Sequence, residues 1–182
     1  MAEQKYYKLN VAGLERDLPI CPINEHLDIA GFVIFGDIEL THACAAELVK
    51  KIPEHDYMIT AESKGIPLIH EMATILNEKK HFVARKGLKA YMVDPISVQV
   101  KSITTAAVQT LYLDGADAAM MRGKKILIVD DVISTGESVV ALEKLIEEAG
   151  GIVCGRAAIL AEGDAAQRDD IVFLEELPLF FH

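Results

Sequence analysis

The segment from Lys125 to Gly150 constrains the fold of this chain more than any other part of the sequence. An apolar run over 126–129 leads directly into two adjacent carboxylates, Asp130 and Asp131, and then into a short loop and an amphipathic stretch over 137–149. A strand that reads as a continuous apolar run is buried on both faces, which is typical of a parallel sheet covered by helices. Open sheets of this kind bind their ligands beyond the carboxyl ends of the strands. The acidic pair therefore stands where a ligand is expected.

The rest of the chain alternates between β-like and helical periodicity, which indicates an α/β fold. We expect helices over 42–52, 66–77 and 137–149, and strands over 56–61, 81–85, 109–113, 125–129 and 152–160. Together they predict one domain over residues 1–182, built as a mainly parallel twisted sheet with helices on both faces. Its core is expected over about 41–160, with a small hood from about 1–40 and 161–182. The stretch 86–108 has weak periodicity and is predicted to be a long functional loop.

The composition fits one soluble domain. The 182 residues are 51% hydrophobic, which is enough for one sizeable core, and the formal net charge is -10. Nucleic acids and anionic membranes attract surfaces rich in Lys and Arg, so neither is an expected partner. Three cysteines without CxxC spacing indicate reduced thiols rather than disulfides or a zinc site. The N-terminal MAEQKYYKLN lacks the apolar core of a signal peptide, and no apolar run is long enough for a membrane span, so we expect a cytoplasmic protein.

The loop after the acidic pair has the composition of a monophosphate site. Residues 134–138, Ser-Thr-Gly-Glu-Ser, bring hydroxyl groups and a glycine to the start of a helix. Backbone N–H groups and the positive end of the helix dipole bind phosphate at such a position. Asp130 and Asp131 repel a phosphate, but they suit the hydroxyl groups of a ribose, or a metal ion. The two halves jointly describe a sugar diol that carries a 5-phosphate.

Three alternative interpretations of this segment are less consistent with the sequence. A plain strand end followed by a helix cap explains each half alone, but not both halves in register. A response-regulator receiver also begins with an apolar strand and two Asp, but it needs a Lys further along, and none follows Lys144. A triphosphate-binding P-loop over 150–156 has Arg156 in place of Lys and follows a helix instead of preceding one.

The segment Ile126 to Ser138 (ILIVDDVISTGES) resembles the motif by which type I phosphoribosyltransferases bind 5-phosphoribosyl-1-pyrophosphate, PRPP. The resemblance covers most of residues 30–160 and implies the type I phosphoribosyltransferase fold. It implies that Asp130 and Asp131 are catalytic residues that anchor the ribose, and Glu137 departs mildly from the usual motif. The residues implied to bind the 5-phosphate are Ser134, Thr135, Gly136, Glu137 and Ser138.

Two further segments resemble the pyrophosphate side of the same family. Ala61 to Gly65 (AESKG) is similar to the family's pyrophosphate loop, which often carries a non-proline cis peptide, here expected between Glu62 and Ser63. The region of Arg85 and Lys86 is similar to the strand end and flexible loop of the adenine, xanthine and archaeal hypoxanthine members. An acidic protein that accepts an anionic ligand is expected to concentrate cations at the site. By this resemblance, the pyrophosphate-binding residues are Glu62, Ser63, Lys64, Gly65, Arg85, Lys86 and Lys89, and Lys86 also contributes to catalysis.

The base is expected to bind near the N-terminal segment. Val33 to Ile38 (VIFGDI) is similar to the base-site segment of adenine phosphoribosyltransferases, which implies Phe35 against the purine and the backbone of Ile34 on its edge. Adenine enzymes usually have Arg where Gly36 stands, and an acidic residue in the closing loop, where this sequence has Ser102, Thr104 and Thr105. Gln109 to Gly115 (QTLYLDG) is instead similar to a strand of archaeal hypoxanthine-type members. Adenine is therefore the first expectation, with hypoxanthine, guanine or xanthine as the alternative.

The resemblance implies a purine salvage enzyme that displaces pyrophosphate from C1 of PRPP with a ring nitrogen of a purine base. Positive charge develops on the ribose and negative charge on the leaving group, so cations stabilise the transition state. Mg²⁺ is the implied cofactor, bound mainly through PRPP, and its protein ligands stay open. A homodimer is the implied assembly. The alternative is a non-catalytic regulator that binds PRPP or a nucleotide, against which the acidic charge and the complete pyrophosphate loop count.

Overall fold

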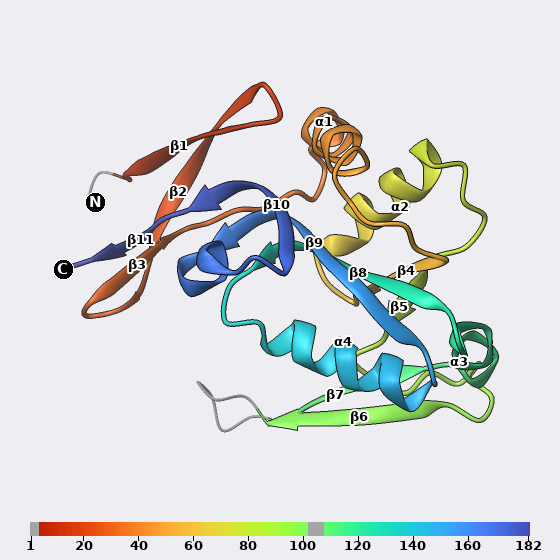
Figure 1. The fold of residues 1–182 in the computed structure, drawn as a ribbon. Coiled ribbons are helices and arrows are strands. Elements are labelled where there is room, and N and C mark those ends of the chain that lie inside the picture. The colour runs from red at the N-terminus through yellow and green to blue at the C-terminus, as the bar shows by residue number, and fades with distance from the viewer. Residues whose placement is uncertain (1–3, 102–107) are drawn as a thin grey trace.

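The computed structural model describes residues 4–101 and 108–182. Its centre is a five-stranded sheet in the order β10-β9-β8-β4-β5, and every neighbouring pair in it is parallel (Figure 1). The prediction of a mainly parallel sheet is confirmed. The strands are β4 (Tyr57–Ala61), β5 (Phe82–Ala84), β8 (Lys125–Ile133), β9 (Ile152–Glu162) and β10 (Ile171–Leu177).

Helices cover both faces of this sheet, as predicted (Figure 1). Side chains along β8 alternate between the faces: Leu127 and Val129 belong to one buried cluster, and Ile126 and Ile128 to the other. Burial on both faces therefore explains the continuous apolar run of this strand. The first face carries α1 (Ile38–Leu48) and α2 (Gly65–Ile75), and the second carries α3 (Gly115–Met121) and α4 (Glu137–Glu148).

A small antiparallel sheet forms a hood at one end of the central sheet, and both described ends of the chain lie there (Figure 1). The expected C-terminal contribution to the hood is correct only for the last strand, because residues 171–177 instead form β10 and extend the central sheet. Ile171 and Leu177 are buried in that position, and Pro178, which has no N–H to donate, separates the two strands. The hood strands are β1 (Tyr6–Val11), β2 (Leu14–Asn24), β3 (Leu27–Ala30) and β11 (Leu179–Phe181).

The stretch 86–108 contains a strand that the sequence analysis did not predict. β6 (Ile96–Lys101) pairs antiparallel with β7 (Val108–Leu113). Ile96 and Val98 alternate with polar residues and pack against the buried cluster that includes α4, which is the period-two pattern of a half-buried strand. The expectation of a structureless loop is therefore wrong for β6. The residues expected in the closing loop, Ser102, Thr104 and Thr105, lie outside the described ranges.

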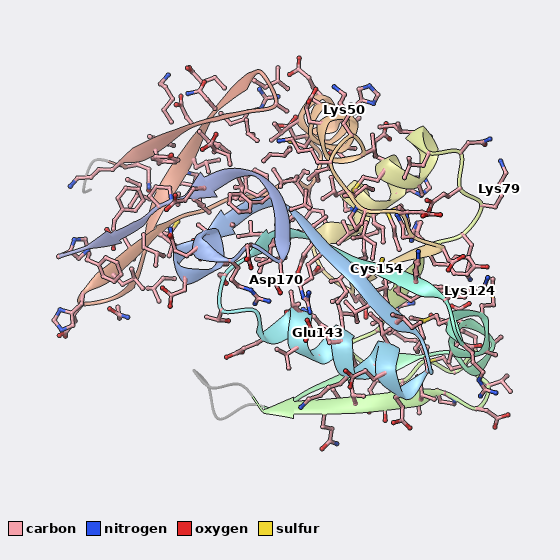
Figure 2. All side chains as sticks on the ribbon, in the orientation of Figure 1. Lys50, Lys79, Lys124, Glu143, Cys154 and Asp170 are labelled. Carbon is pink, nitrogen blue, oxygen red and sulfur yellow. The ribbon has the colours of Figure 1, made fainter. Side chains whose placement is uncertain are left out.

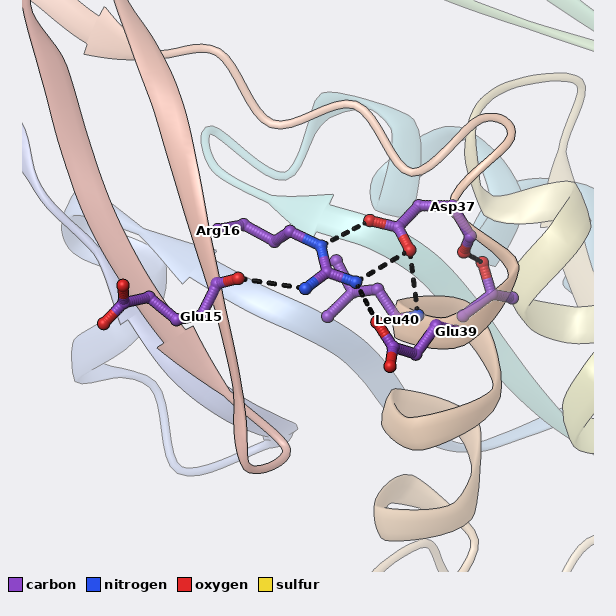
Figure 3. Close-up of polar contacts among 6 residues, drawn as sticks. Glu15, Arg16, Asp37, Glu39 and Leu40 are labelled. Atoms are coloured by element: carbon purple, nitrogen blue, oxygen red, sulfur yellow. Dashed lines mark hydrogen bonds and ion pairs between the residues drawn. The ribbon is translucent and has the colours of Figure 1, made fainter.

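One arginine fastens the hood to the start of α1 (Figure 3). Arg16 on β2 donates from Nε to Asp37 Oδ2 at 2.7 Å and from Nη2 to Glu39 Oε2 at 2.7 Å. Asp37 also caps α1, because its Oδ1 accepts from the N–H of Leu40 at 3.0 Å. This cap explains why α1 begins at Ile38, four residues before the start expected from the apolar periodicity alone.

A second arginine ties three elements together on the other face. Arg156 on β9 donates from Nε to Glu143 of α4 at 2.6 Å, and its Nη1 lies 3.1 Å from Asp170, which precedes β10. Figure 2 labels both acidic residues. The three cysteines are free thiols, as expected. Within the described ranges, no helix has both the length and the apolar character needed to cross a membrane.

Replacing Asp37 tests whether the hood depends on this capped ion pair. Asp37→Ala removes both the cap and the partner of Arg16, and we expect it to lower the free energy of unfolding by about 1–2 kcal/mol. Asp37→Asn keeps a capping oxygen and should lower the free energy of unfolding less than Asp37→Ala does. The hydrogen bond from Arg16 lowers the pKa of Asp37, so the ion pair stabilises the fold at neutral pH and is lost as pH falls through that low pKa. Urea unfolding of wild type and variants at pH 7 and pH 3 measures this. Equal free energies of unfolding for wild type and Asp37→Ala at pH 7 would contradict the role of the capped ion pair.

Candidate functional site

The loop after β8 forms a small cavity at the start of α4. Gly136 precedes the helix with φ 78°, a left-handed conformation that favours glycine, and it offers no side chain to cap the first N–H groups of the helix. Those donors and the Ser134 and Thr135 hydroxyls surround about 110 Å³ of space. We call this space the phosphate cavity; it is lined by Asp130 and by residues 132–139, and so includes Glu137 and Ser138.

Two buried carboxylates stand beside the phosphate cavity. Asp130 and Asp131 are only 7% and 4% exposed. Asp130 Oδ1 accepts from the Ser63 hydroxyl at 3.2 Å and from the N–H of Asp131 at 2.9 Å. Burial, with the charge of Asp131 as the second cause, raises the pKa of Asp130 to about 7. The fold thus holds at this strand end a charge that is costly to bury, which is a property of functional sites.

The loop between β4 and α2 lies directly against Asp130, and a glycine makes this approach possible. A Cβ at Gly65 would stand 2.5 Å from Thr60 Oγ1 and 3.0 Å from Asp130 Oδ1, so a larger residue forces the loop away. The expected cis peptide between Glu62 and Ser63 is wrong, since the described residues contain no cis peptide bond. The trans loop already brings the Ser63 hydroxyl to Asp130 without the roughly 2.5–4 kcal/mol that a non-proline cis bond costs.

The structure brings together four of the residues expected on the pyrophosphate side, around Glu62. Its carboxylate accepts from Arg85 Nη2 at 2.9 Å and from the N–H of Lys86 at 2.9 Å, and the Lys89 ammonium lies 3.8 Å away. The hydrogen bond from Arg85 is the main cause that lowers the pKa of Glu62 to about 2. Within the described ranges, the exposed Lys86 ammonium forms neither a hydrogen bond nor an ion pair. Glu62 therefore holds cations in place, and Lys86 is the cation most open to a ligand.

Lys64 points away from this group of cations and toward the hood. Its ammonium donates to the carbonyl of Phe32 at 2.6 Å and lies 3.0 Å from Asp131 Oδ2. This contact is an ion pair, and Asp131 Oδ2 has no hydrogen-bond partner, so this buried oxygen keeps its accepting capacity. Lys64 thus connects the hood segment to the acidic pair.

A larger cleft of about 420 Å³ lies between the hood and the carboxyl ends of the strands, within the size range of ligand sites. It shares Val132 and Ser134 with the phosphate cavity, so the two spaces adjoin. The acidic pair stands at the junction, because Asp130 lines the phosphate cavity and Asp131 the cleft. We call this space the hood cleft; it is lined by residues 29–33, Lys64, Asp131, Val132, Ser134, Glu162 and Leu177.

The two residues expected to bind a base do not line the hood cleft. Ile34 is fully buried in the core and its carbonyl accepts from the N–H of Asp37 at 3.1 Å, while Phe35 is 58% exposed. Two residues of the cleft were not predicted from the sequence, namely Phe32 and Glu162, the last residue of β9. The sequence shows only that Glu162 follows the predicted strand 152–160, and the strand order is needed to set it beside β8.

The donors at the site fit Mg²⁺ only when a ligand completes its shell. The described residues contain no group of three or more His, Cys, Asp or Glu side chains arranged to hold a metal. Asp130 and Asp131 offer hard carboxylate oxygens, and Mg²⁺ is usually bound in proteins by one or two carboxylates together with substrate phosphates. The site therefore fits an ion that arrives with a phosphorylated ligand.

Comparison with known proteins agrees with this geometry. Residues 37–177 match the family model described as phosphoribosyl transferase domain. The chain is 32% identical over 113 residues to the hypoxanthine/guanine phosphoribosyltransferase of Ferroglobus placidus, and this match covers 62% of this chain and 56% of that protein. It is 30% identical over 116 residues to the adenine phosphoribosyltransferase of Brachyspira hyodysenteriae, and this match covers 64% of this chain and 65% of that protein. The matches thus span less than two thirds of the length of these two relatives.

A solved structure confirms the fold. The adenine phosphoribosyltransferase of Thermoanaerobacter pseudethanolicus superposes with a TM-score of 0.63 at 21% identity, over 76% of this chain and 80% of that chain. At this identity the likeness concerns the arrangement of the sheet and helices.

Asp130→Asn tests the cost of the buried charge. A raised pKa means that ionised Asp130 opposes folding above about pH 7, and that this cost disappears below the unfolded pKa near 4. We expect the variant to be more stable than the wild type by roughly 1–3 kcal/mol at pH 8, and equally stable near pH 4. Thermal unfolding at both pH values measures this, with the exposed Asp17→Asn as control. A variant that is less stable at pH 8 contradicts the assignment.

Proposed function

Because this chain belongs to the phosphoribosyl transferase domain family, we propose that it transfers the 5-phosphoribosyl group of PRPP to a purine base, giving a nucleoside monophosphate and pyrophosphate. One observation carries the proposal: the phosphate cavity adjoins the hood cleft through Val132 and Ser134, with the two buried carboxylates at the junction. A nucleoside monophosphate has the same order of parts, namely phosphate, ribose diol and base.

The phosphate cavity suits the 5-phosphate because its donors are backbone N–H groups and hydroxyls at a helix start. Asp130 and Asp131 accept hydrogen bonds from the ribose hydroxyls, and the free accepting capacity of Asp131 Oδ2 supports this role. Their negative charge also lies beside the ribose, where positive charge develops as the bond to pyrophosphate breaks. The carboxylates therefore both orient the sugar and stabilise the transition state.

The cations stabilise the leaving group. Among the four cations expected at the pyrophosphate, Lys86 is the one whose ammonium forms no hydrogen bond or ion pair in the described ranges, and it binds the pyrophosphate first. Arg85 and Lys89 follow, because the phosphate oxygens replace Glu62 as their partner. Mg²⁺, which Asp130 and Asp131 would help to hold, supplies further positive charge to the pyrophosphate when it is bound.

The hood cleft receives the base. Its walls include Phe32 and Leu177, which suit a flat ring, and both named relatives act on purines. The expectation of adenine depended on the segment 33–38, but Ile34 and Phe35 do not line the cleft. The choice among purines therefore depends on other residues of the hood cleft.

A base panel tests the proposed reaction. Purified protein with PRPP and Mg²⁺ is offered adenine, hypoxanthine, guanine, xanthine, uracil and orotate in turn, and pyrophosphate release is measured. We expect release with at least one purine and none with the pyrimidines. The double variant Asp130→Asn with Asp131→Asn should lose at least about 100-fold in rate while it stays folded, because the ribose loses its charged partners. Asp17→Asn, a matched change on the hood surface, should behave as wild type.

Two results would contradict the proposed function. Tight PRPP binding without pyrophosphate release on any base means that the chain binds ligand without turnover. Unchanged PRPP kinetics in the double variant mean that the ribose does not bind at the acidic pair.

A further inference from the structure

Glu162 is a carboxyl group in the hood cleft that the reaction described above does not use. It is the last residue of β9, next to β8 in the sheet and opposite Leu177 of β10. Its carboxyl forms no hydrogen bond and no ion pair with any residue in the described ranges. The other carboxyl of the cleft, Asp131, forms an ion pair with Lys64 and is assigned to the ribose in the proposed reaction. Glu162 therefore has its full accepting capacity available to a ligand.

The surroundings of Glu162 disfavour the charged form of its carboxyl. Burial raises the pKa of its carboxyl above the ordinary value for Glu, and the charge of Lys64 only partly opposes this. The carboxyl oxygens of Glu162 are not fully buried, so they remain accessible to a ligand that donates a hydrogen bond in place of water. Besides Asp131, which the proposed reaction assigns to the ribose, the cleft thus presents a second carboxyl acceptor, Glu162, on a wall that otherwise includes apolar residues such as Phe32 and Leu177.

Purine bases differ in what they offer to a carboxylate. Hypoxanthine and guanine carry a 6-oxo group and a hydrogen on N1, and guanine adds the N2 amino group beside it. Adenine has a bare N1, whose lone pair repels a carboxylate, next to its N6 amino group. A carboxylate accepts hydrogen bonds and donates none, so it pairs with the N1–H edge of a 6-oxopurine. The Lys64 ammonium in the same cleft offers a donor for a 6-oxo group, which adenine lacks.

We propose that Glu162 is a specificity-determining residue that selects 6-oxopurines over adenine by accepting the N1–H of the base, and the N2 amino hydrogen where the base is guanine. This inference rests on the proposed function and names the purines within it. It agrees with the 32% identity to a hypoxanthine/guanine phosphoribosyltransferase. The same site rejects adenine because an unpaired carboxylate would face its N1.

Glu162→Gln tests the assignment because it replaces the carboxylate, which only accepts hydrogen bonds, by an amide of nearly the same size that also donates. A glutamine amide has one acceptor and one donor, which matches the N6 amino group and N1 of adenine. We expect wild type to have a higher kcat/KM for guanine and hypoxanthine than for adenine. In Glu162→Gln, the ratio of guanine to adenine kcat/KM should fall by about 10- to 100-fold, with the KM for PRPP unchanged. Glu147→Gln on the exposed face of α4 is the matched control and should keep the wild-type ratio.

The outcomes separate this inference from the proposed function. If wild type converts purines but prefers adenine, or if Glu162→Gln keeps the wild-type ratio, the inference is overturned while the reaction stands. If wild type converts no base, the proposed reaction fails, and calorimetric titration with GMP and AMP tests Glu162 directly. A preference for GMP that Glu162→Gln weakens or reverses supports the inference, and an unchanged preference overturns it.

Discussion

The burial of two adjacent carboxylates at the end of β8 is the constraint on which the rest of the site depends. Asp130 and Asp131 are almost inaccessible, and two like charges at such a position oppose folding unless neighbours compensate for them. The neighbours come from one loop, because Ser63 donates to Asp130 and Lys64 pairs with Asp131. The close approach of that loop in turn requires Gly65. The acidic pair and the loop before α2 thus stabilise each other's position through these contacts.

The same constraint positions the hood. The Lys64 ammonium that pairs with Asp131 also donates to the carbonyl of Phe32, so the acidic pair reaches the segment that roofs the hood cleft. At the far end of this segment, Arg16 and Asp37 fasten it to α1. The segment along the hood cleft is therefore held at both ends, by the contact of Lys64 to the acidic pair and by the contact of Arg16 to the start of α1. In the proposed reaction, the base and the sugar phosphate would bind to parts of the chain that are linked through Lys64.

The sequence predicted those parts of the fold and site that depend on local pattern. The apolar run of β8, the acidic pair and the small-residue loop are contiguous, so their spacing revealed the phosphate cavity and the family. β10 was missed because it belongs to the central sheet through its pairing with β9, and the local sequence pattern does not show that pairing. Ile34 and Phe35 were placed at the base by resemblance, and this stays a prediction, while a turn closed by the Asp37 N–H directs the Ile34 side chain into the core. Glu162 needed the strand order, since only that order sets it beside Asp131.

Charge pairing explains how an acidic chain can receive a highly charged anion. With a net charge of -10, the protein as a whole repels an anion such as the PRPP of the proposed reaction, so attraction must come from cations held locally. Glu62 holds Arg85 and Lys89 in position while no ligand is bound, and its low pKa keeps it ionised at neutral pH. Phosphate oxygens can then take over the guanidinium and ammonium groups without a new ordering of long side chains, which lowers the entropic cost of binding. The carboxylates of the site thus prepare it for an anion, even though alone they would repel one.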